Sequence, residues 1–203
     1  HPRVVATIRR QIRYSNRAST FQAESGLHHA LGVDGYARFS APMREVVGIF
    51  THKEGLERLG LASPGEDLDD IELRTRAIKA ANDAKKRQRT LTKEAHGLAI
   101  DQLLADDLLM SQADRPFRAG SVFGLRSSRL YVELDDFPIE LKVYRGDLEA
   151  SFDCAYVAQR NDTLLAPREG GGPSFSLGDE IWLQTAARDA ERRRWSFRIR
   201  PQG

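Results

Sequence analysis

Cysteine and long apolar runs are nearly missing from this sequence, and each absence excludes a class of protein. Cys154 is the single cysteine among 203 residues. A disulfide framework and a zinc site made of several thiolates are therefore excluded, and a reducing, cytoplasmic compartment is expected. No apolar run approaches the roughly 18 residues that a membrane-spanning helix needs, so we expect no membrane partner. Hydrophobic residues at 40% and charged residues at 30% indicate a folded chain with a core.

Lysine is scarce as well, because 25 of the 31 basic residues are arginine. The planar guanidinium group of arginine suits phosphate better than the point charge of lysine does. Residues 1–20 contain five arginines and no acidic residue. A polyanionic partner and a simple preference for arginine on solvated surfaces both explain this composition, and a formal net charge of +2 does not decide between them.

The first half of the chain has helical periodicity. Residues 4–15 place apolar side chains on one side and arginines on the other, which predicts a short amphipathic helix. A second helix is expected from Pro42, a residue favoured at a first helical position, to Leu59, with Gly60 as its stop. A third is expected to start at Ser63, the first residue of a capping-box pattern, and to run for roughly 40 residues, or about 60 Å.

After residue 113 the period changes to the alternation of β-strands. Five strands are expected, around residues 117–123, 130–134, 139–143, 181–185 and 195–199. Five strands in about 90 residues are typical of a small Greek-key barrel of the OB type. The sequence therefore predicts an α+β protein in which a helical part precedes a five-stranded barrel.

One string of residues resembles a known family. It reads HHALGVDGY at 28–36 and FSAPMR at 39–44, and His52 follows. It resembles the closing part of the catalytic domain of the ribonuclease II family, the RNB-domain exoribonucleases that include RNase R. That family carries the run H-x-x-L-G-L-x-x-Y-x-x-F-T-S-P-I-R-R with a further histidine after it. Its members continue with paired helices and end in an OB-fold RNA-binding module, which is the order expected here.

The resemblance implies a domain organisation and a function. Residues 1–113 would be the C-terminal part of an RNB-type catalytic domain, and residues 114–203 an OB-fold RNA-binding domain. The intact protein would be a Mg²⁺-dependent 3′→5′ exoribonuclease that hydrolyses single-stranded RNA to nucleoside monophosphates. Since the chain opens with His1-Pro2, we expect it to be a C-terminal half that works with an upstream N-terminal half of the same protein.

The resemblance also assigns site residues. Arg44 matches the arginine that contacts the scissile phosphate, and Glu94 matches a glutamate near the active site. In the expected helix, Arg44 would stand in the first turn, where free backbone N–H groups favour a phosphate whose charge grows during attack. Tyr36 and Ser40 are candidates for lining the RNA path. His28 and His52 are expected to form structural hydrogen bonds.

The expected barrel adds candidates for RNA binding. The arginines expected to contact phosphate are Arg126, Arg198 and Arg200. Aromatic side chains that could stack on bases, or lie in the core instead, are Tyr131, Tyr144, Trp182 and Trp195. Alternation alone does not say which face of the barrel is buried.

The sequence departs from the family pattern at Ala41, Glu45 and Gly48, where a serine, an arginine and an aspartate are usual. The family's Asp cluster for Mg²⁺ precedes the motif, whereas the acids at 67–70 follow it and stand at an expected helix start. No metal site is therefore predicted here, and the Mg²⁺ ligands are expected upstream. Two alternatives stay open: an RNA-binding protein that has lost hydrolysis, and a structural or interaction subunit.

Overall fold

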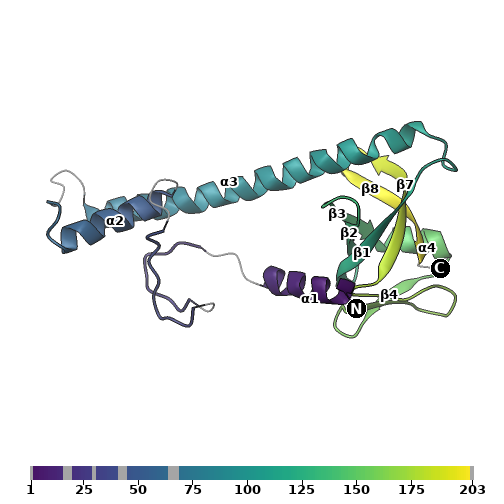
Figure 1. The fold of residues 1–203 in the computed structure, drawn as a ribbon, viewed down its shortest axis with the longest axis horizontal. Helices are drawn as coiled ribbons and strands as arrows, with labels where there is room; N and C mark the ends of the chain where they lie inside the picture. The colour runs from purple at the N-terminus through teal and green to yellow at the C-terminus, as the bar shows by residue number, and fades with distance from the viewer. Residues whose placement is uncertain (1, 16–19, 29–30, 41–44, 64–68, 202–203) are drawn as a thin grey trace. The chain divides into compact units, whose positions relative to one another are not determined.

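The computed structural model describes residues 2–15, 20–28, 31–40, 45–63 and 69–201 (Figure 1). The chain divides into two compact units. One, here called the barrel unit, contains residues 1–17 and 95–203, and the other, the helical unit, contains residues 18–94. This spatial division differs from a boundary between residues 113 and 114, and the assignment of two domains at that boundary stays a prediction.

The fold is α+β, with helices followed by antiparallel sheets. All five expected strands are present as β1 (Phe117–Arg126), β2 (Arg129–Leu134), β3 (Glu140–Tyr144), β7 (Glu180–Asp189) and β8 (Arg194–Pro201). They form one antiparallel sheet in the order β3-β2-β1-β7-β8. The edge strands β3 and β8 contact each other, so the sheet curls into a partly open barrel of the OB type.

Four elements of the barrel unit were not expected from the sequence. The helix α4 (Arg145–Phe152) follows β3, and a small second sheet contains β4 (Tyr156–Gln159), β5 (Leu164–Pro167) and β6 (Phe175–Ser176). These strands have two to four residues each, too few for alternation to identify them.

The barrel core includes the side chains that alternation places on the inner face, together with buried residues of the helices and of the second sheet such as Leu104, Leu148 and Phe175. They are fully or almost fully buried and include Leu130, Val132, Leu141, Val143, Ile181, Leu183, Phe197 and Ile199. Branched and aromatic side chains pack well on a pleated surface that is covered on one side, which is why these segments form strands.

A buried carboxylate joins the end of the long helix to the barrel. Asp107 lies in the short 3₁₀ helix η1 (Asp106–Leu109) and is 2% exposed. It accepts two hydrogen bonds from Arg118 of β1, one of them 2.8 Å long, and one from the hydroxyl of Thr185 of β7. Burial by itself would raise the pKa of Asp107, but these donors and the charge of Arg118 outweigh it and hold that pKa below its ordinary value. Asp107 is therefore a buried ion-pair partner that connects the segment after α3 to two barrel strands.

The helix α1 (Pro2–Ser15) forms as expected, but with the opposite face against the barrel. Arg3 and Arg10 contact barrel side chains, whereas Ile8 and Ile12 are 53% and 61% exposed. Figure 1 shows α1, in purple, beside β1. The polar contacts of Arg3 and Arg10 therefore help to hold this helix on the barrel, while Ile8 and Ile12 of its apolar stripe stay exposed.

The two helices that begin in the helical unit start later than the sequence predicted. The helix α2 (Val46–Arg58) begins after Glu45, whose backbone is extended, whereas the expected start at Pro42 lies outside the described residues. The helix α3 (Asp70–Leu104) begins after Asp69, whose carboxylate accepts the N–H of Ile71 at 2.9 Å, and not at Ser63.

The ends of both helices lie close to where the sequence placed them. Gly60, at a φ of +69°, follows α2 as its expected stop. The 35 residues of α3 span about 52 Å, with the last turns in the barrel unit. None of the helices within the described residues is long and apolar enough to cross a membrane.

Candidate nucleic-acid interface

The motif segment of the helical unit begins with a tight turn. The carbonyl of His28 accepts the N–H groups of Leu31 and Gly32 at 2.9 and 2.8 Å, and the N–H of His28 donates to the carbonyl of Val33 at 2.8 Å. Gly32 has a φ of +64°, which glycine adopts without strain. Tyr36 leaves this turn with its ring 5.0 Å from the ring of His28, and it is exposed. Its side chain is thus available to a ligand.

His52 fastens the second part of the motif to α2. Its Nε2 lies 2.8 Å from the carbonyl oxygen of Phe39, and the two rings are 5.3 Å apart. The hydrogen bond expected of His52 is present and is structural. Ser40 follows Phe39 directly and is exposed. Arg44 lies outside the described residues, and it directly precedes the residue that caps α2.

Two cations, Arg38 and Lys85, interact with that residue, which stands at the N-cap of α2 without a side-chain capping hydrogen bond. The carboxylate of Glu45 lies 3.2 Å from Nε of Arg38. Burial lowers the pKa of Lys85 in α3, the charges of Arg38 and Arg89 lower it further, and Glu45 partly opposes them. Glu45 therefore interacts with Arg38 and Lys85, and Arg89 adds a third positive charge close enough to act on Lys85.

The position of Lys85 is fixed by contacts within the helical unit. Its Nζ lies 3.8 Å from the centre of the Phe21 ring. Asn82, one turn earlier on α3, accepts the N–H of Phe21 at 3.0 Å and donates to its carbonyl at 2.9 Å. Lys85 and Arg89 are four residues apart on α3, so a helical pattern could have placed them together, but no pattern in the sequence indicates Arg38 as their neighbour.

Glu94 lies on α3 with its side chain exposed. Its role stays a prediction from the resemblance, because no contact of this side chain with the part of the chain that the structure describes distinguishes it from another exposed glutamate of the helix.

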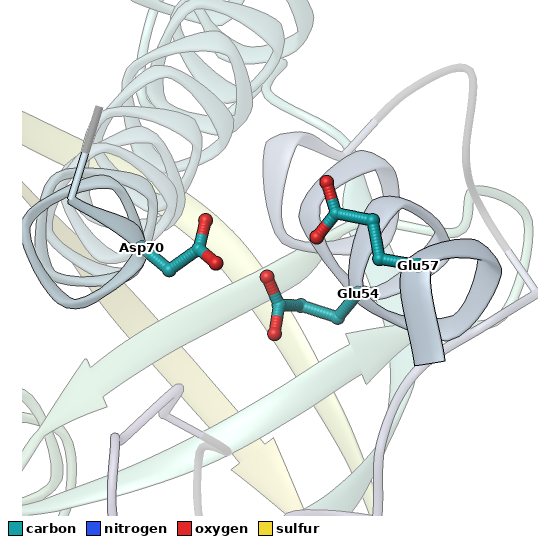
Figure 2. A group of neighbouring side chains, drawn as sticks. All are labelled: Glu54, Glu57 and Asp70. Carbon is teal, nitrogen blue, oxygen red and sulfur yellow. The ribbon is translucent and has the colours of Figure 1, made fainter. Parts of the chain in front are cut away.

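Among the described residues, one group of three acidic side chains has the spacing of a metal site. Glu54, Glu57 and Asp70 place one oxygen each within 4.8 Å of the others (Figure 2). The ammonium group of Lys53 lies at 3.2, 2.7 and 2.7 Å from their oxygens, and those hydrogen bonds, that of Asp70 first, raise the pKa of Lys53. This cluster therefore binds a lysine and joins α2 to α3. It does not fit the Mg²⁺ that the resemblance implies.

The outer face of β7 and β8 combines cations with an aromatic ring. Arg198 and Arg200 alternate along β8 and are both exposed. Arg200 stands opposite Trp182 of β7, which is 37% exposed, and its guanidinium lies 3.9 Å from the centre of the Phe117 ring. Strand residues directly opposite each other share a face, so a phosphate-binding group and a stacking surface lie together here.

Arg126 does not join that patch. It is exposed at the hairpin end of β1, nine residues from Phe117, or about 30 Å of extended strand. The structure therefore brings two of the three predicted barrel arginines together and leaves the third apart.

The other three barrel aromatics contact neighbouring side chains of the barrel unit. Trp195 is 8% exposed and donates from Nε1 to Asp101 at 2.7 Å. Tyr144 lies beneath the guanidinium of Arg194, with 3.7 Å to its ring centre, and Tyr131 packs against the ring of Phe123. Trp182 is thus the most accessible of the four candidates for stacking.

Comparisons with known proteins find similarity in structure. No protein-family model and no curated protein matches the sequence. The apo form of Mycoplasma genitalium RNase R is similar with a TM-score of 0.67 and 14% identity, over 89% of this chain and 27% of that chain. The same enzyme in complex with ribose-methylated single-stranded RNA gives a TM-score of 0.69 and 14% identity, over 91% of this chain and 28% of that one. The chain spans little more than a quarter of those proteins and has the fold of that part.

Proposed function

We propose that this chain is the C-terminal part of a 3′→5′ exoribonuclease that hydrolyses single-stranded RNA to nucleoside monophosphates. The observation that carries the proposal is the order of motif, helices and barrel, in a fold similar to part of RNase R over 89% of the chain. One of the similar structures holds single-stranded RNA. The sequence motif at residues 28–52 supports the proposal independently, because the resemblance of the motif rests on residue types and spacing and not on the fold.

In the proposed function the barrel binds the RNA strand. Trp182 stacks on a base, while Arg198 and Arg200 hold neighbouring phosphates. Stacking of one base on an aromatic side chain contributes about 1–3 kcal/mol and does not depend on which base it is. Arg126, at the far end of β1, contacts a more distant phosphate of the same strand.

The helical unit holds the reacting end of the strand in this proposal. Tyr36 and Ser40, both exposed, line the RNA path. Arg44 stabilises the charge that develops on the scissile phosphate, and the cations around Glu45 add to the positive potential there. Glu94 is proposed as a second catalytic residue, on the resemblance alone. Mg²⁺ supplies the activated water when it is bound, and we expect its carboxylate ligands in an upstream half of the protein.

A time course on 5′-labelled single-stranded RNA with Mg²⁺ tests the proposal. The chain alone is compared with the chain joined to the coding segment upstream of it. We expect stepwise shortening from the 3′ end only for the combination. Arg44→Ala should abolish shortening, whereas Arg58→Ala, at the exposed far end of α2, should not. Shortening at an unchanged rate by Arg44→Ala would refute the assignment of that residue.

A second candidate function is RNA binding without hydrolysis. Two departures from the family pattern favour it. Glu45 stands where a second arginine is usual, and it pairs with Arg38. Gly48, which is buried in α2, stands where an aspartate is usual. This function predicts tight, salt-dependent RNA binding by both proteins and no Mg²⁺-dependent shortening. Negligible RNA affinity at low salt would instead favour a structural or interaction subunit.

A further inference from the structure

The barrel carries a group of carboxylates under α1, and two arginines of α1, Arg3 and Arg10, are bound to them. Arg3 donates to both carboxylate oxygens of Asp135, at 2.9 and 2.7 Å, and to the hydroxyl of Ser121. Its guanidinium also lies 3.1 Å from the carboxylate of Glu180. One arginine therefore contacts two acidic residues, from the turn after β2 and from the start of β7.

Arg10, two turns further along α1, binds a second pair of acids. Its two terminal nitrogens donate to Glu133 of β2 and Glu140 of β3, and its guanidinium lies 4.0 Å from the centre of the Phe123 ring. Glu133 and Glu140 are direct cross-strand partners. Like charges in that position repel each other, so the pair depends on a cation held between them.

A chain of contacts connects this carboxylate group to the outer face of β7 and β8. Glu180 and Trp182 are two residues apart on β7 and share a face. Nε1 of Trp182 donates to a carboxylate oxygen of Glu180 at 3.0 Å, and the other oxygen of Glu180 faces Arg3. Without Arg3, Glu180 would keep a full negative charge beside the aromatic ring and close to Arg200.

We propose that α1 is a positioning element for RNA binding by the barrel, and that it acts by neutralising acids instead of touching RNA. Arg3 and Arg10 cancel part of the charge of Asp135, Glu133, Glu140 and Glu180, which would otherwise repel phosphates that approach Trp182 and Arg200. The inference rests on the proposed function, in that it takes the barrel to bind single-stranded RNA.

The test is a charge cycle on the whole chain, with fluorescein-labelled oligouridylate as the probe and fluorescence anisotropy as the measurement. Arg3→Gln should weaken binding by about three- to ten-fold at low salt, because one uncompensated charge about 10 Å from two or three phosphates has that effect in water. The loss should shrink at high salt. Arg9→Gln, an exposed change of equal charge on the same helix, is the matched control and should weaken binding less.

The combination of Arg3→Gln with Glu180→Gln should restore binding to near the wild-type value, since the amide oxygen can still accept from Trp182. Failure of this rescue would mean that Arg3 contacts RNA or holds the fold, and would overturn the inference. Equal effects of Arg3→Gln and Arg9→Gln would overturn the inference as well. In both of these outcomes the unmodified chain still binds RNA, so the proposed function would remain. A wild-type chain that binds no RNA would overturn both.

Discussion

Replacing Asp107 by asparagine tests how the end of α3 is held on the barrel. The change keeps the volume of the side chain but removes its charge and turns one acceptor into a donor. Arg118 and Thr185 both donate to Asp107, so one of them would then face an N–H group in a site that is 2% exposed. Arg118 would also lose its counter-charge.

The magnitude follows from the burial of the pair. Removing one partner of a buried ion pair costs about 3–5 kcal/mol. Arg118 keeps some contact with solvent, and asparagine keeps one acceptor, so we expect about 2–4 kcal/mol for Asp107→Asn. For a chain of this length each kcal/mol lowers the melting temperature by about 2–4 °C, which predicts a fall of about 5–15 °C.

Intrinsic fluorescence is the suitable assay, because both tryptophans, Trp182 and Trp195, lie in the barrel unit and report on its unfolding. Asp106→Asn is the control, since Asp106 is the exposed neighbour of Asp107 in the same short helix. A melting temperature no lower for Asp107→Asn than for Asp106→Asn would refute the reasoning.

The stability of the wild type relative to Asp107→Asn has a predictable pH dependence. The pKa of Asp107 is lower in the folded chain than its ordinary value of 3.8. A carboxylate with a depressed folded pKa stabilises the fold above the unfolded pKa and loses that contribution as the pH falls through the folded pKa. The difference in stability between the wild type and Asp107→Asn should therefore be constant near neutral pH and shrink below about pH 4. A difference that grows in acid would contradict this sign.

Three further changes have defined outcomes in the same fluorescence assay. Gly120→Ala should destabilise the barrel by about 1–3 kcal/mol, because a Cβ there would lie 2.7 Å from the carbonyl oxygen of Glu133 on the neighbouring strand. Leu130→Ala should cost about 2–5 kcal/mol, because this side chain is fully buried, whereas exposed Leu109→Ala should change stability by less than about 0.5 kcal/mol. Ile8→Ser should also cost less than about 1 kcal/mol, since Ile8 is half exposed; a large loss would mean that the apolar stripe of α1 is buried in solution.

Part of the candidate site was accessible from the sequence. The motif at residues 28–52 predicted a structural hydrogen bond of His52, which is present, while the roles of Tyr36 and Ser40, both exposed, stay predictions. Arg198 and Arg200 were predicted on one strand, and the structure places them on one exposed face. The sequence did not distinguish Trp182 from Trp195 as candidates for stacking. Alternation shows which side chains of a strand point to opposite faces, but not which face another element covers.

The sequence by itself determined the secondary structure wherever periodicity was long. The five barrel strands and the helices α1, α2 and α3 follow from the spacing of apolar side chains, which each segment carries in its own residues. Helix starts did not follow in the same way, because Ser63 and Asp69 are both residues favoured as N-caps. The strands β4, β5 and β6 did not follow either, because they are too short to have a measurable period.

Only the tertiary structure decided which faces meet. The periodicity of α1 suggested a buried apolar face, yet Arg3 and Arg10 lie on the barrel because they bind carboxylates more than a hundred residues away in the sequence. The buried role of Asp107 likewise depends on the fold, which brings Arg118 and Thr185 to its carboxylate from two separate strands. Local spacing sets the conformation of a segment, whereas burial and charge neutralisation depend on residues that the fold alone brings together.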